Sequence, residues 1–272
     1  MQIYKDMNIG TAKVTEEEMQ GIPHYLIDFI SPDKRYSVSE YVKDARSKIE
    51  DILNKGKKPI VVGGTGLYIE SLIYENVFEE EEYDLGYRNY LNDIAEKGGL
   101  EELYNEALKI DEEAAKKISK NDKKRIIRIL EIYHKTGKTK TERDLNSRQK
   151  NLKYEYKLFC IDIKRDILYN RINDRVDKML NQGLVLEVEQ ILKKYREFPT
   201  AMQGLGYKEV VEYIQNKISY DEMKEKIKQE TRHYAKRQLT WFRKYDQAIW
   251  LDGLNSVEEN IDKILNIIDI GE

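Results

Sequence analysis

Residues 59–68 read PIVVGGTGLY, and this stretch decides which fold the rest of the chain can form. The apolar run Pro59-Ile60-Val61-Val62 is followed at once by Gly63-Gly64-Thr65-Gly66, and apolar residues resume at Leu67. A short continuous apolar run is typical of a strand that is buried on both faces. Glycines at the end of such a strand let the backbone turn tightly into a helix. The stretch therefore predicts a strand, a glycine turn and the start of a helix.

The segments on either side extend this alternation. Residues 24–30, HYLIDFI, have the composition of a strand. Ser37 and Glu40 form a capping box, and apolar residues then recur at helical spacing until near Gly56. A further strand is predicted at residues 158–163. Strands that are apolar on both faces and alternate with helices favour an α/β fold with a parallel sheet covered by helices.

The middle of the chain departs from this pattern. Residues from about 78 to 155 are polar and helical in spacing, and they contain no convincing strand. We interpret them as a helical insertion between two parts of one α/β core, residues 1–77 and about 156–272. The C-terminal part is predicted to be helical again over 166–192 and 221–245.

The composition is that of a soluble, enzyme-sized protein. The chain has 272 residues, of which 40% are hydrophobic and 36% are charged. No apolar run is long enough to cross a bilayer and the first residues resemble no export signal, so we expect a cytoplasmic protein with no membrane partner. The single cysteine, Cys160, excludes an internal disulfide. With only three histidines, a dedicated metal site built by the protein is not expected.

The distribution of charge is more informative than the net charge of −3. Residues 231–245 contain five Lys or Arg residues and no acid. On a helix, Arg232, Lys236 and Arg243 would share one face, and the aromatic residues of the segment would lie on the opposite face. Such a cationic face suits a phosphate backbone, and a solvated charged face is the alternative.

Other features also suit an anionic ligand. In a second basic stretch, residues 116–128, Lys124 and Arg128 lie four residues apart. Arg171 and Arg175 share a helix face, and their guanidinium groups suit phosphate, although salt bridges to neighbouring acids would explain them equally well. The backbone amides of the glycine turn could hold an anion, but the turn is not a Walker loop because no Gly-Lys-Ser/Thr follows. A tight connection between two elements is the alternative there.

Seven blocks of sequence follow one another over nearly the whole chain. They are MQIYKDMNIGTAK (1–13), VGGTGLY (62–68), NDKKRIIRILE (121–131), TGK (136–138), RINDRVDKML (171–180), QGLGYKE (203–209) and AKRQLTWFR (235–243). As a set and in this order, they resemble the tRNA dimethylallyltransferase (tRNA isopentenyltransferase) family. Such a set is far more specific than any single motif.

The resemblance implies a P-loop NTPase-like parallel-sheet core with an inserted helical domain that binds tRNA. In that family the core binds the pyrophosphate of dimethylallyl diphosphate with Mg²⁺. The dimethylallyl group then passes to the exocyclic N6 amine of the adenosine next to the anticodon. Core and insertion grip the anticodon stem-loop between them. We therefore expect dimethylallyl diphosphate and a tRNA anticodon stem-loop as substrates, Mg²⁺ as the cofactor, and a monomer.

The resemblance also assigns roles to residues. Thr65 is expected at the reaction centre, where it would hydrogen-bond the substrate or assist the leaving group. Gln2 would contact the target adenine, and Arg175 is a candidate for the pyrophosphate. The residues expected to bind tRNA are Gln2, Arg88, Lys124, Arg125, Arg128, Gln203, Tyr207, Lys208, Lys236, Arg237, Trp241 and Arg243.

The family pattern also includes elements that stand before the block at residue 1. These are a first strand, a Gly-Pro-Thr-x-x-Gly-Lys-Thr loop with its helix, and an Asp-Ser-x-Gln motif whose Asp is the expected general base. Met1-Gln2 takes up this last motif two residues late, so the base would precede Met1. We therefore expect a truncated form of such an enzyme. The sequence leaves four functions open: prenyl transfer to tRNA, adenylate isopentenyltransferase activity, a nucleotide kinase with a parallel-sheet core, and tRNA binding without catalysis.

Overall fold

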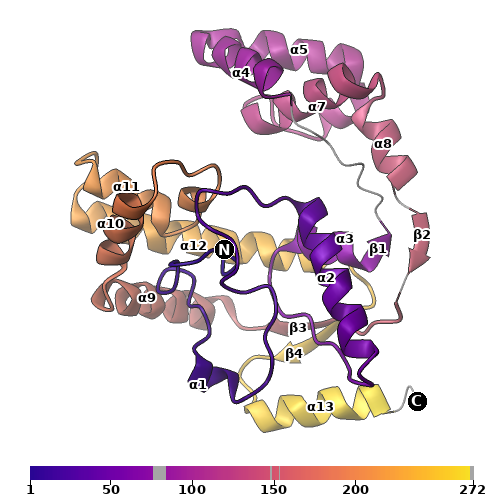
Figure 1. The fold of residues 1–272 in the computed structure, drawn as a ribbon, viewed down its shortest axis with the longest axis vertical. Coiled ribbons are helices and arrows are strands. Elements are labelled where there is room, and N and C mark those ends of the chain that lie inside the picture. The colour runs from indigo at the N-terminus through magenta and orange to yellow at the C-terminus, as the bar shows by residue number, and fades with distance from the viewer. Residues whose placement is uncertain (76–83, 148, 153, 270–272) are drawn as a thin grey trace. The chain divides into compact units, whose positions relative to one another are not determined.

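The structure of the protein is a computed structural model that describes residues 1–75, 84–147, 149–152 and 154–269. The chain divides into two compact units (Figure 1). The core unit comprises residues 1–70 and 155–272, and the insertion unit comprises residues 71–154. Each unit has its own cluster of buried hydrophobic side chains. The domain boundary predicted near residue 78 lies outside the described residues.

The core unit is predominantly helical. Its helices are α1 (Glu16–Met19), α2 (Val38–Leu53), α3 (Gly66–Ile73), α9 (Arg165–Asn181), α10 (Leu184–Lys194), the 3₁₀ turn η2 (Ala201–Gln203), α11 (Tyr207–Ile214), α12 (Tyr220–Phe242) and α13 (Val257–Asp269). Its strands are β3 (Phe159–Asp162) and β4 (Ile249–Asp252). Helix α3 continues from the core unit into the insertion unit.

Local sequence signals explain where the helices begin and end. The capping box predicted at Ser37 and Glu40 starts α2, and each side chain accepts a hydrogen bond from the other residue's backbone N–H. The long helical stretch predicted at residues 166–192 is divided into α9 and α10 at Gly183, whose φ of +99° is a left-handed value that glycine adopts without strain. The predicted C-terminal helix is confirmed as α12.

The main core lies among α9, α10, α11 and α12. Helix α12 packs against α9 and α11, and α10 packs against α9 and α11. The N-terminal segment contributes to this core because Tyr4 and Met7 are almost completely buried in it. The first residues of the chain are therefore anchored to helices that lie more than 170 residues further along the sequence.

The sheet is smaller than the sequence pattern predicts. The strand predicted at residues 158–163 is present as β3, and it pairs in parallel with β4, which was not predicted (Figure 1). The α/β class is thus confirmed with a small parallel sheet. The wider P-loop-like core remains a prediction.

The strands predicted at residues 24–30 and 59–62 are wrong in this structure. Leu26 and Asp28 have φ values of +59° and +58°, which interrupt an extended backbone, and only Ile30 forms a bridge, with Tyr4. Residues 59–62 take no part in the strand pairing of the described residues. Their side chains stay largely exposed, 85% for Ile60 and 89% for Val62. A strand needs a neighbour to satisfy its backbone, which a local apolar pattern cannot supply.

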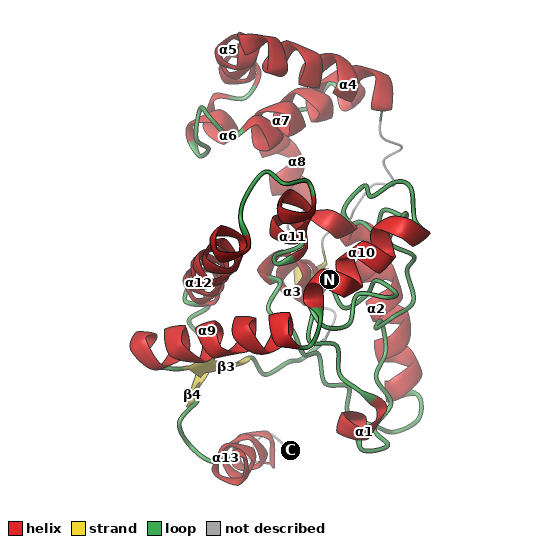
Figure 2. Cartoon of the chain, turned by 90° about the vertical axis from the view of Figure 1, so that its left-hand side faces the viewer, coloured by secondary structure: helices red, strands yellow, loops and turns green. Residues whose placement is uncertain are grey.

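The insertion unit is helical, and its helices α4 to α8 can be followed in Figure 2. Its elements are α4 (Leu85–Ile94), the π-helical turn η1 (Ala95–Gly99), α5 (Leu100–Ile110), α6 (Glu112–Lys116), α7 (Lys123–Thr136) and α8 (Lys140–Ser147). The strands β1 (Tyr74–Glu75) and β2 (Gln149–Leu152) form a short antiparallel pair. Helix α7 is central to this unit, since it packs against α4, α5, α6 and α8.

Among the described helices, none combines the length and the apolar character that a membrane crossing requires.

Candidate active site and nucleic-acid interface

The glycine turn at residues 63–66 leads directly into α3. The Thr65 carbonyl accepts hydrogen bonds from the N–H groups of Tyr68 (2.9 Å) and Ile69 (3.1 Å), so the helix begins at the turn. The Thr65 side chain is exposed. A hydroxyl at the N-terminus of a helix, next to backbone amides without helical partners, is suited to an anionic or polar group of a substrate.

Two sequence blocks meet at this turn. Gln238 of α12 donates a hydrogen bond from Nε2 to the Gly64 carbonyl oxygen at 2.8 Å. The Trp241 ring of the same helix lies so close to Gly66 that a Cβ atom there would stand 2.3 Å from Trp241 Cδ1. A residue with a side chain at position 66 would push the turn away from α12. The glycine turn is therefore fixed to the basic helix, and Gln238 is a positioning residue that sequence analysis missed.

Helix α12 largely has the two faces that its sequence predicts. Ile227 is buried, as is Tyr245 just beyond the end of the helix, whereas the candidate tRNA contacts Lys236, Arg237 and Arg243 are exposed. Arg232 differs, because its Nη1 donates to Asn173 Oδ1 of α9 at 2.7 Å. The cationic face is thus formed by the C-terminal half of the helix.

Trp241 is held between the turn and a lysine. The ammonium group of Lys244 lies 4.0 Å from the centre of the Trp241 ring and forms an ion pair with Glu70 at 2.6 Å. The Trp241 Nε1 atom is buried without a hydrogen-bond partner. The indole is thus in contact with Gly66 and Lys244, and a direct contact of Trp241 with tRNA remains a prediction.

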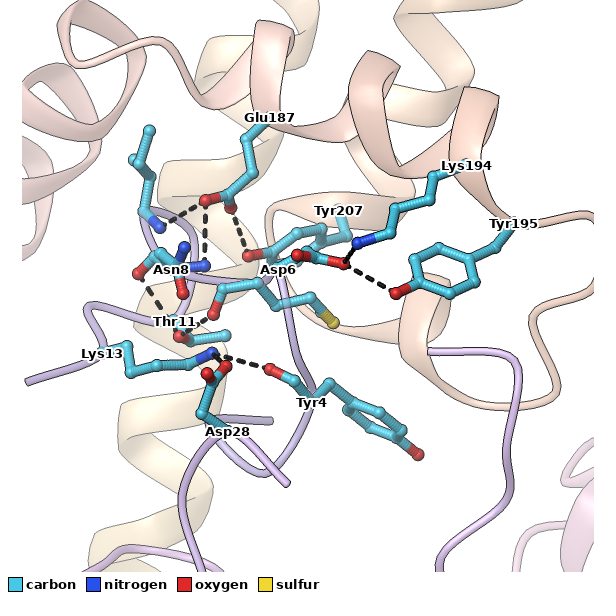
Figure 3. Close-up of polar contacts among 12 residues, drawn as sticks. Tyr4, Asp6, Asn8, Thr11, Lys13, Asp28, Glu187, Lys194, Tyr195 and Tyr207 are labelled. Atoms are coloured by element: carbon cyan, nitrogen blue, oxygen red, sulfur yellow. Dashed lines mark hydrogen bonds and ion pairs between the residues drawn. The ribbon is translucent and has the colours of Figure 1, made fainter. Parts of the chain in front are cut away.

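The N-terminal block is clasped by a carboxylate (Figure 3). Glu187 of α10 accepts hydrogen bonds from the backbone N–H groups of Asn8 (2.9 Å), Ile9 (2.7 Å) and Gly10 (3.2 Å). It also accepts one from the Tyr207 hydroxyl at 2.6 Å. Four donors satisfy a carboxylate that is itself almost fully buried, which removes the cost of burying its charge.

Tyr207, a predicted tRNA contact, is packed inside the core unit. Its side chain is completely buried against the N-terminal loop, and a Cβ on Gly10 would stand 2.5 Å from its ring. Burial, together with the hydrogen bond to Glu187, raises the pKa of its hydroxyl. The buried side chain positions the N-terminal loop in this structure, and the contact of Tyr207 with tRNA remains a prediction.

The other two candidates from this loop remain near the surface. Gln203 is exposed. Lys208 forms ion pairs with Glu209 at 3.3 Å and, at the 4.0 Å limit, with Glu230. Gly204 lies against Met1, where a Cβ would stand 3.0 Å from Met1 Cε. The Gln203–Lys208 loop and the start of the chain are therefore neighbours in the core unit.

Further polar contacts fix the N-terminal segment. The Gln2 amide donates to the carbonyl oxygens of Thr11 (3.1 Å) and Ala12 (2.9 Å), so it is engaged with the backbone in this structure. Lys13 donates to the Tyr4 carbonyl oxygen at 2.7 Å and pairs with Asp28. The contact of Gln2 with the target adenine remains a prediction.

A cluster of tyrosines connects α3 to α2. The rings of Tyr41 and Tyr68 stack at 4.3 Å between centroids. The pKa of Tyr68 is raised to about 12. Burial is the largest cause, and the neighbouring Tyr4, Tyr41 and Glu40 add to it. The helix that follows the glycine turn is thus anchored on one side by aromatic stacking and on the other by α12.

In the insertion unit, the residues predicted to contact tRNA differ in exposure and in ion pairing. Lys124 and Arg125 are exposed, and Arg125 forms a surface ion pair with Asp122 at 3.2 Å. Arg88 instead forms a bidentate ion pair with Glu131, with N–O distances of 2.5 and 2.7 Å. Arg128 is half-buried beside the same carboxylate, 3.9 Å away.

Arg175, the candidate for the pyrophosphate, is exposed on α9, and its neighbour Arg171 donates to the Gly253 carbonyl oxygen at 3.4 Å. No described contact connects Arg175 to the glycine turn. Its role remains a prediction.

Comparison with known proteins places the chain in a family. The family model described as IPP transferase matches residues 2–245. A tRNA dimethylallyltransferase of Thermoanaerobacter sp. strain X514 is 49% identical, with 97% of this chain and 87% of that protein covered.

Solved structures agree with this result. The crystal structure of a tRNA delta(2)-isopentenylpyrophosphate transferase from Staphylococcus epidermidis matches with a TM-score of 0.70 and 41% identity, covering 99% of this chain and 88% of that one. A eukaryotic dimethylallyltransferase acting on tRNA matches with a TM-score of 0.79 and 30% identity over 99% of this chain and 71% of that one.

The fold and the site define an α/β protein with a helical insertion and a cationic helix packed on a glycine turn. The chain belongs to the IPP transferase family.

Proposed function

We propose that this protein is a tRNA dimethylallyltransferase, which transfers the dimethylallyl group of dimethylallyl diphosphate to the N6 amine of the adenosine next to the anticodon. The observation that carries the proposal is the junction of the glycine turn and α12. A polar turn suited to a diphosphate and a helix face suited to an RNA backbone are fixed to each other through Gln238 and Trp241. The family match extends over both blocks.

The chemistry explains why such a junction is useful. The exocyclic amine of adenine is a weak nucleophile because its lone pair is delocalised into the ring, so the acceptor must be held close to the allylic carbon. The leaving diphosphate carries negative charge that hydrogen-bond donors stabilise. Thr65, with its exposed hydroxyl at the start of α3, is our candidate donor. Lys236 and Arg243 would hold the RNA backbone.

The target base must leave its stack to reach an electrophile inside a protein. An anticodon loop offers bases that are already single-stranded, which lowers this cost. We therefore propose the anticodon stem-loop as the RNA substrate, with binding energy from phosphates and specificity from loop bases.

Mg²⁺ is the proposed cofactor, as usual for a diphosphate substrate. The described residues include no group of three or more His, Cys, Asp or Glu side chains that could hold a metal ion. Mg²⁺ is often bound through substrate phosphates and water with one or two carboxylates. The described residues therefore do not form a metal cage of their own, and the ion would bind together with the diphosphate.

The test combines transfer and binding on one preparation of the full chain. Radiolabelled dimethylallyl diphosphate is incubated with Mg²⁺ and an anticodon stem-loop, with EDTA or AMP as separate arms. Transfer to RNA, abolished by EDTA, is the expected result. Transfer to AMP instead would identify an adenylate isopentenyltransferase. RNA binding without transfer would identify a binding protein and overturn the proposal.

A substitution at the turn tests the assigned residue. Thr65→Ala is expected to lower the turnover of bound RNA by about tenfold or more, with little change in RNA affinity, because it removes a donor at the diphosphate. Thr65→Ser keeps the hydroxyl and is expected to restore most of the turnover. An equal fall of turnover and affinity in Thr65→Ala would contradict a role in the reaction.

A further inference from the structure

A pocket opens in the insertion unit between α6, α7 and α8, and its volume is about 280 Å³. Its apolar surface is formed by Ala114, Ile118, Ile129 and Leu145. Ile129 is buried, whereas Leu145 is 69% exposed. An isolated, exposed leucine on a helix as polar as α8 is therefore part of an apolar surface that continues into the domain.

Cations surround this apolar surface. Lys117, Arg125, Arg128 and Lys140 all line the pocket, together with two acids, Glu113 and Asp144. Each of these cations forms an ion pair in this structure: Lys117 with Glu113, Arg125 with Asp122, Arg128 with Glu131 and Lys140 with Asp144. The pocket thus offers an apolar floor and a rim of ion-paired cations, which an anion with an apolar or aromatic part would engage in place of the exposed carboxylates.

The walls of the pocket are fixed by a buried carboxylate. Asp111 is only 4% exposed, and its Oδ1 accepts hydrogen bonds from the Ala114 N–H at 3.0 Å and the Thr141 hydroxyl at 2.7 Å. Its Oδ2 accepts the Thr141 N–H at 2.8 Å. Asp111 therefore ties the start of α6 to the start of α8. Because Ala114 and Thr141 both line the pocket, the shape is built into the fold.

We propose that this pocket binds one unstacked nucleotide of the RNA substrate, an inference that rests on the proposed function. The base would lie on the apolar floor, with the guanidinium group of Arg125 or Arg128 against its π-face, and the adjoining phosphate would meet Lys117 and Lys140. The volume suits a single nucleotide, because it is close to the lower limit of about 300 Å³ for small-molecule pockets. Unstacked bases bound in this way are the usual basis of sequence recognition in single-stranded RNA.

The experiment measures the affinity of the full chain for an anticodon stem-loop by fluorescence anisotropy. The pocket variants are Leu145→Asp and Arg125→Glu, which change exposed side chains and should not disturb folding. The matched controls are Leu186→Asp, a leucine of α10 that is 56% exposed, and Lys109→Glu, an exposed lysine of α5. Circular dichroism verifies that all four variants are folded.

Both pocket variants are expected to weaken binding about tenfold, within the range that stacking of one base contributes, and both controls less than twofold. A set of stem-loops, each with one abasic loop position, then locates the nucleotide. An abasic site at one loop position should weaken binding to the wild type. The same abasic site should not weaken binding to the Leu145→Asp variant any further, which is the coupling expected of groups in contact. Free AMP as a competitor distinguishes a nucleotide within RNA from a free one.

Each outcome separates the two proposals. If the wild type does not bind the stem-loop at all, the proposed function fails. If the wild type binds and the pocket variants bind as tightly as the controls, or no abasic position is coupled to Leu145→Asp, the nucleotide pocket is refuted while the proposed function stands. AMP is expected to displace the RNA only at concentrations far above that of the stem-loop; tighter binding of AMP than of the stem-loop would also refute the proposal, since the ligand would then be a free nucleotide.

Discussion

The hydroxyl of Tyr207 donates a hydrogen bond of 2.6 Å to the carboxylate of Glu187, and both side chains are buried. Through this pair, the loop at residues 8–10 is bound to the helices α10 and α11. Two sequence blocks that stand almost 200 residues apart, at 1–13 and 203–209, are thus held together by a residue that belongs to neither block.

The first prediction concerns this clasp. Glu187→Gln keeps the shape of the side chain but replaces an acceptor oxygen by an amide that cannot accept the N–H and O–H donors around it. We expect the free energy of unfolding to fall by about 2–3 kcal/mol, because buried donors lose their charged acceptor. Urea denaturation measures the change. Glu258→Gln, at an exposed glutamate of α13, is the control, and an equal effect of the two variants would contradict the clasp.

Sequence alone predicts those features of the fold that depend on local contacts. The capping box of Ser37 and Glu40 and the two faces of α12 involve residues within a turn or two of one another. The clasp was missed, although Glu187 gives a signal: it occupies the buried face of α10 with Leu184 and Ile191. An acid at a core position of a helix indicates a buried polar contact, but the sequence does not reveal the partner.

Long-range pairing accounts for the errors. Residues 59–62 have the pattern of a buried strand, yet pairing and burial are decided by neighbours elsewhere in the chain. The partner of β3 was missed for the same reason, since β4 lies about 90 residues further along. In the site, the pattern identified Lys236 and Arg243 as surface cations, but it could not tell that Tyr207 would be buried.

The second prediction concerns alkaline pH. The pKa of Tyr68 is raised to about 12 in the folded protein, first by burial and then by neighbouring groups, and the pKa of Tyr207 is raised as well. The folded state therefore holds these protons where the unfolded chain begins to lose them, near pH 10. The contribution of these tyrosines to stability is complete below about pH 10. It is lost as the pH rises toward the pKa values that they have in the folded state.

Urea unfolding at about pH 9, 10 and 11 tests this linkage, because tyrosines of the unfolded chain titrate in that interval. The free energy of unfolding should decrease with pH in the wild type and decrease less steeply in Tyr68→Phe, which has no proton to lose. Identical slopes in the two proteins would show that Tyr68 makes no contribution.

The third prediction distinguishes a structural role of Arg88 from a role in binding tRNA. Its bidentate pair with Glu131, a carboxylate that is 9% exposed, should make Arg88→Ala costly, by about 3 kcal/mol, because the carboxylate would be left buried without this partner. Thermal unfolding measures this loss. If Arg88 is only structural, the folded variant binds the stem-loop as the wild type does at low temperature. Weaker binding by the folded variant would support the contact with tRNA that the family resemblance implies.

The fourth prediction concerns the basic face of α12. Lys236→Ala and Arg243→Ala are each expected to weaken binding of the stem-loop and to lower the slope of log affinity against log salt by about 0.7–0.9, which is the effect of one lost phosphate contact. Lys217→Ala, at an exposed lysine between α11 and α12, provides the control. If the salt slope does not change in either variant, this face of the helix is a solvated charged surface that does not bind the RNA backbone.

The last prediction tests the junction between the glycine turn and α12. A Cβ at Gly66 would stand 2.3 Å from the Trp241 ring, whereas a Cβ at Gly63 would meet no atom within 4 Å. Neither glycine has a positive φ, so the two Gly→Ala substitutions differ chiefly in this contact. Gly66→Ala should lower the free energy of unfolding by about 1–3 kcal/mol through overpacking, and prenyl transfer should fall with it. Gly63→Ala should change stability by about 0.5 kcal/mol at most.

The Gly66→Ala substitution in a Trp241→Leu background shows whether contact with the Trp241 ring causes the loss of stability. Trp241→Leu removes the ring that the new methyl group would meet, so Gly66→Ala should cost less stability in that background than in the wild type. Equilibrium unfolding of the four proteins gives the coupling energy of the pair, which contacting residues show and distant ones do not. Additive effects would mean that the turn does not rest on Trp241, and the proposed structural link between the glycine turn and α12 would then be refuted.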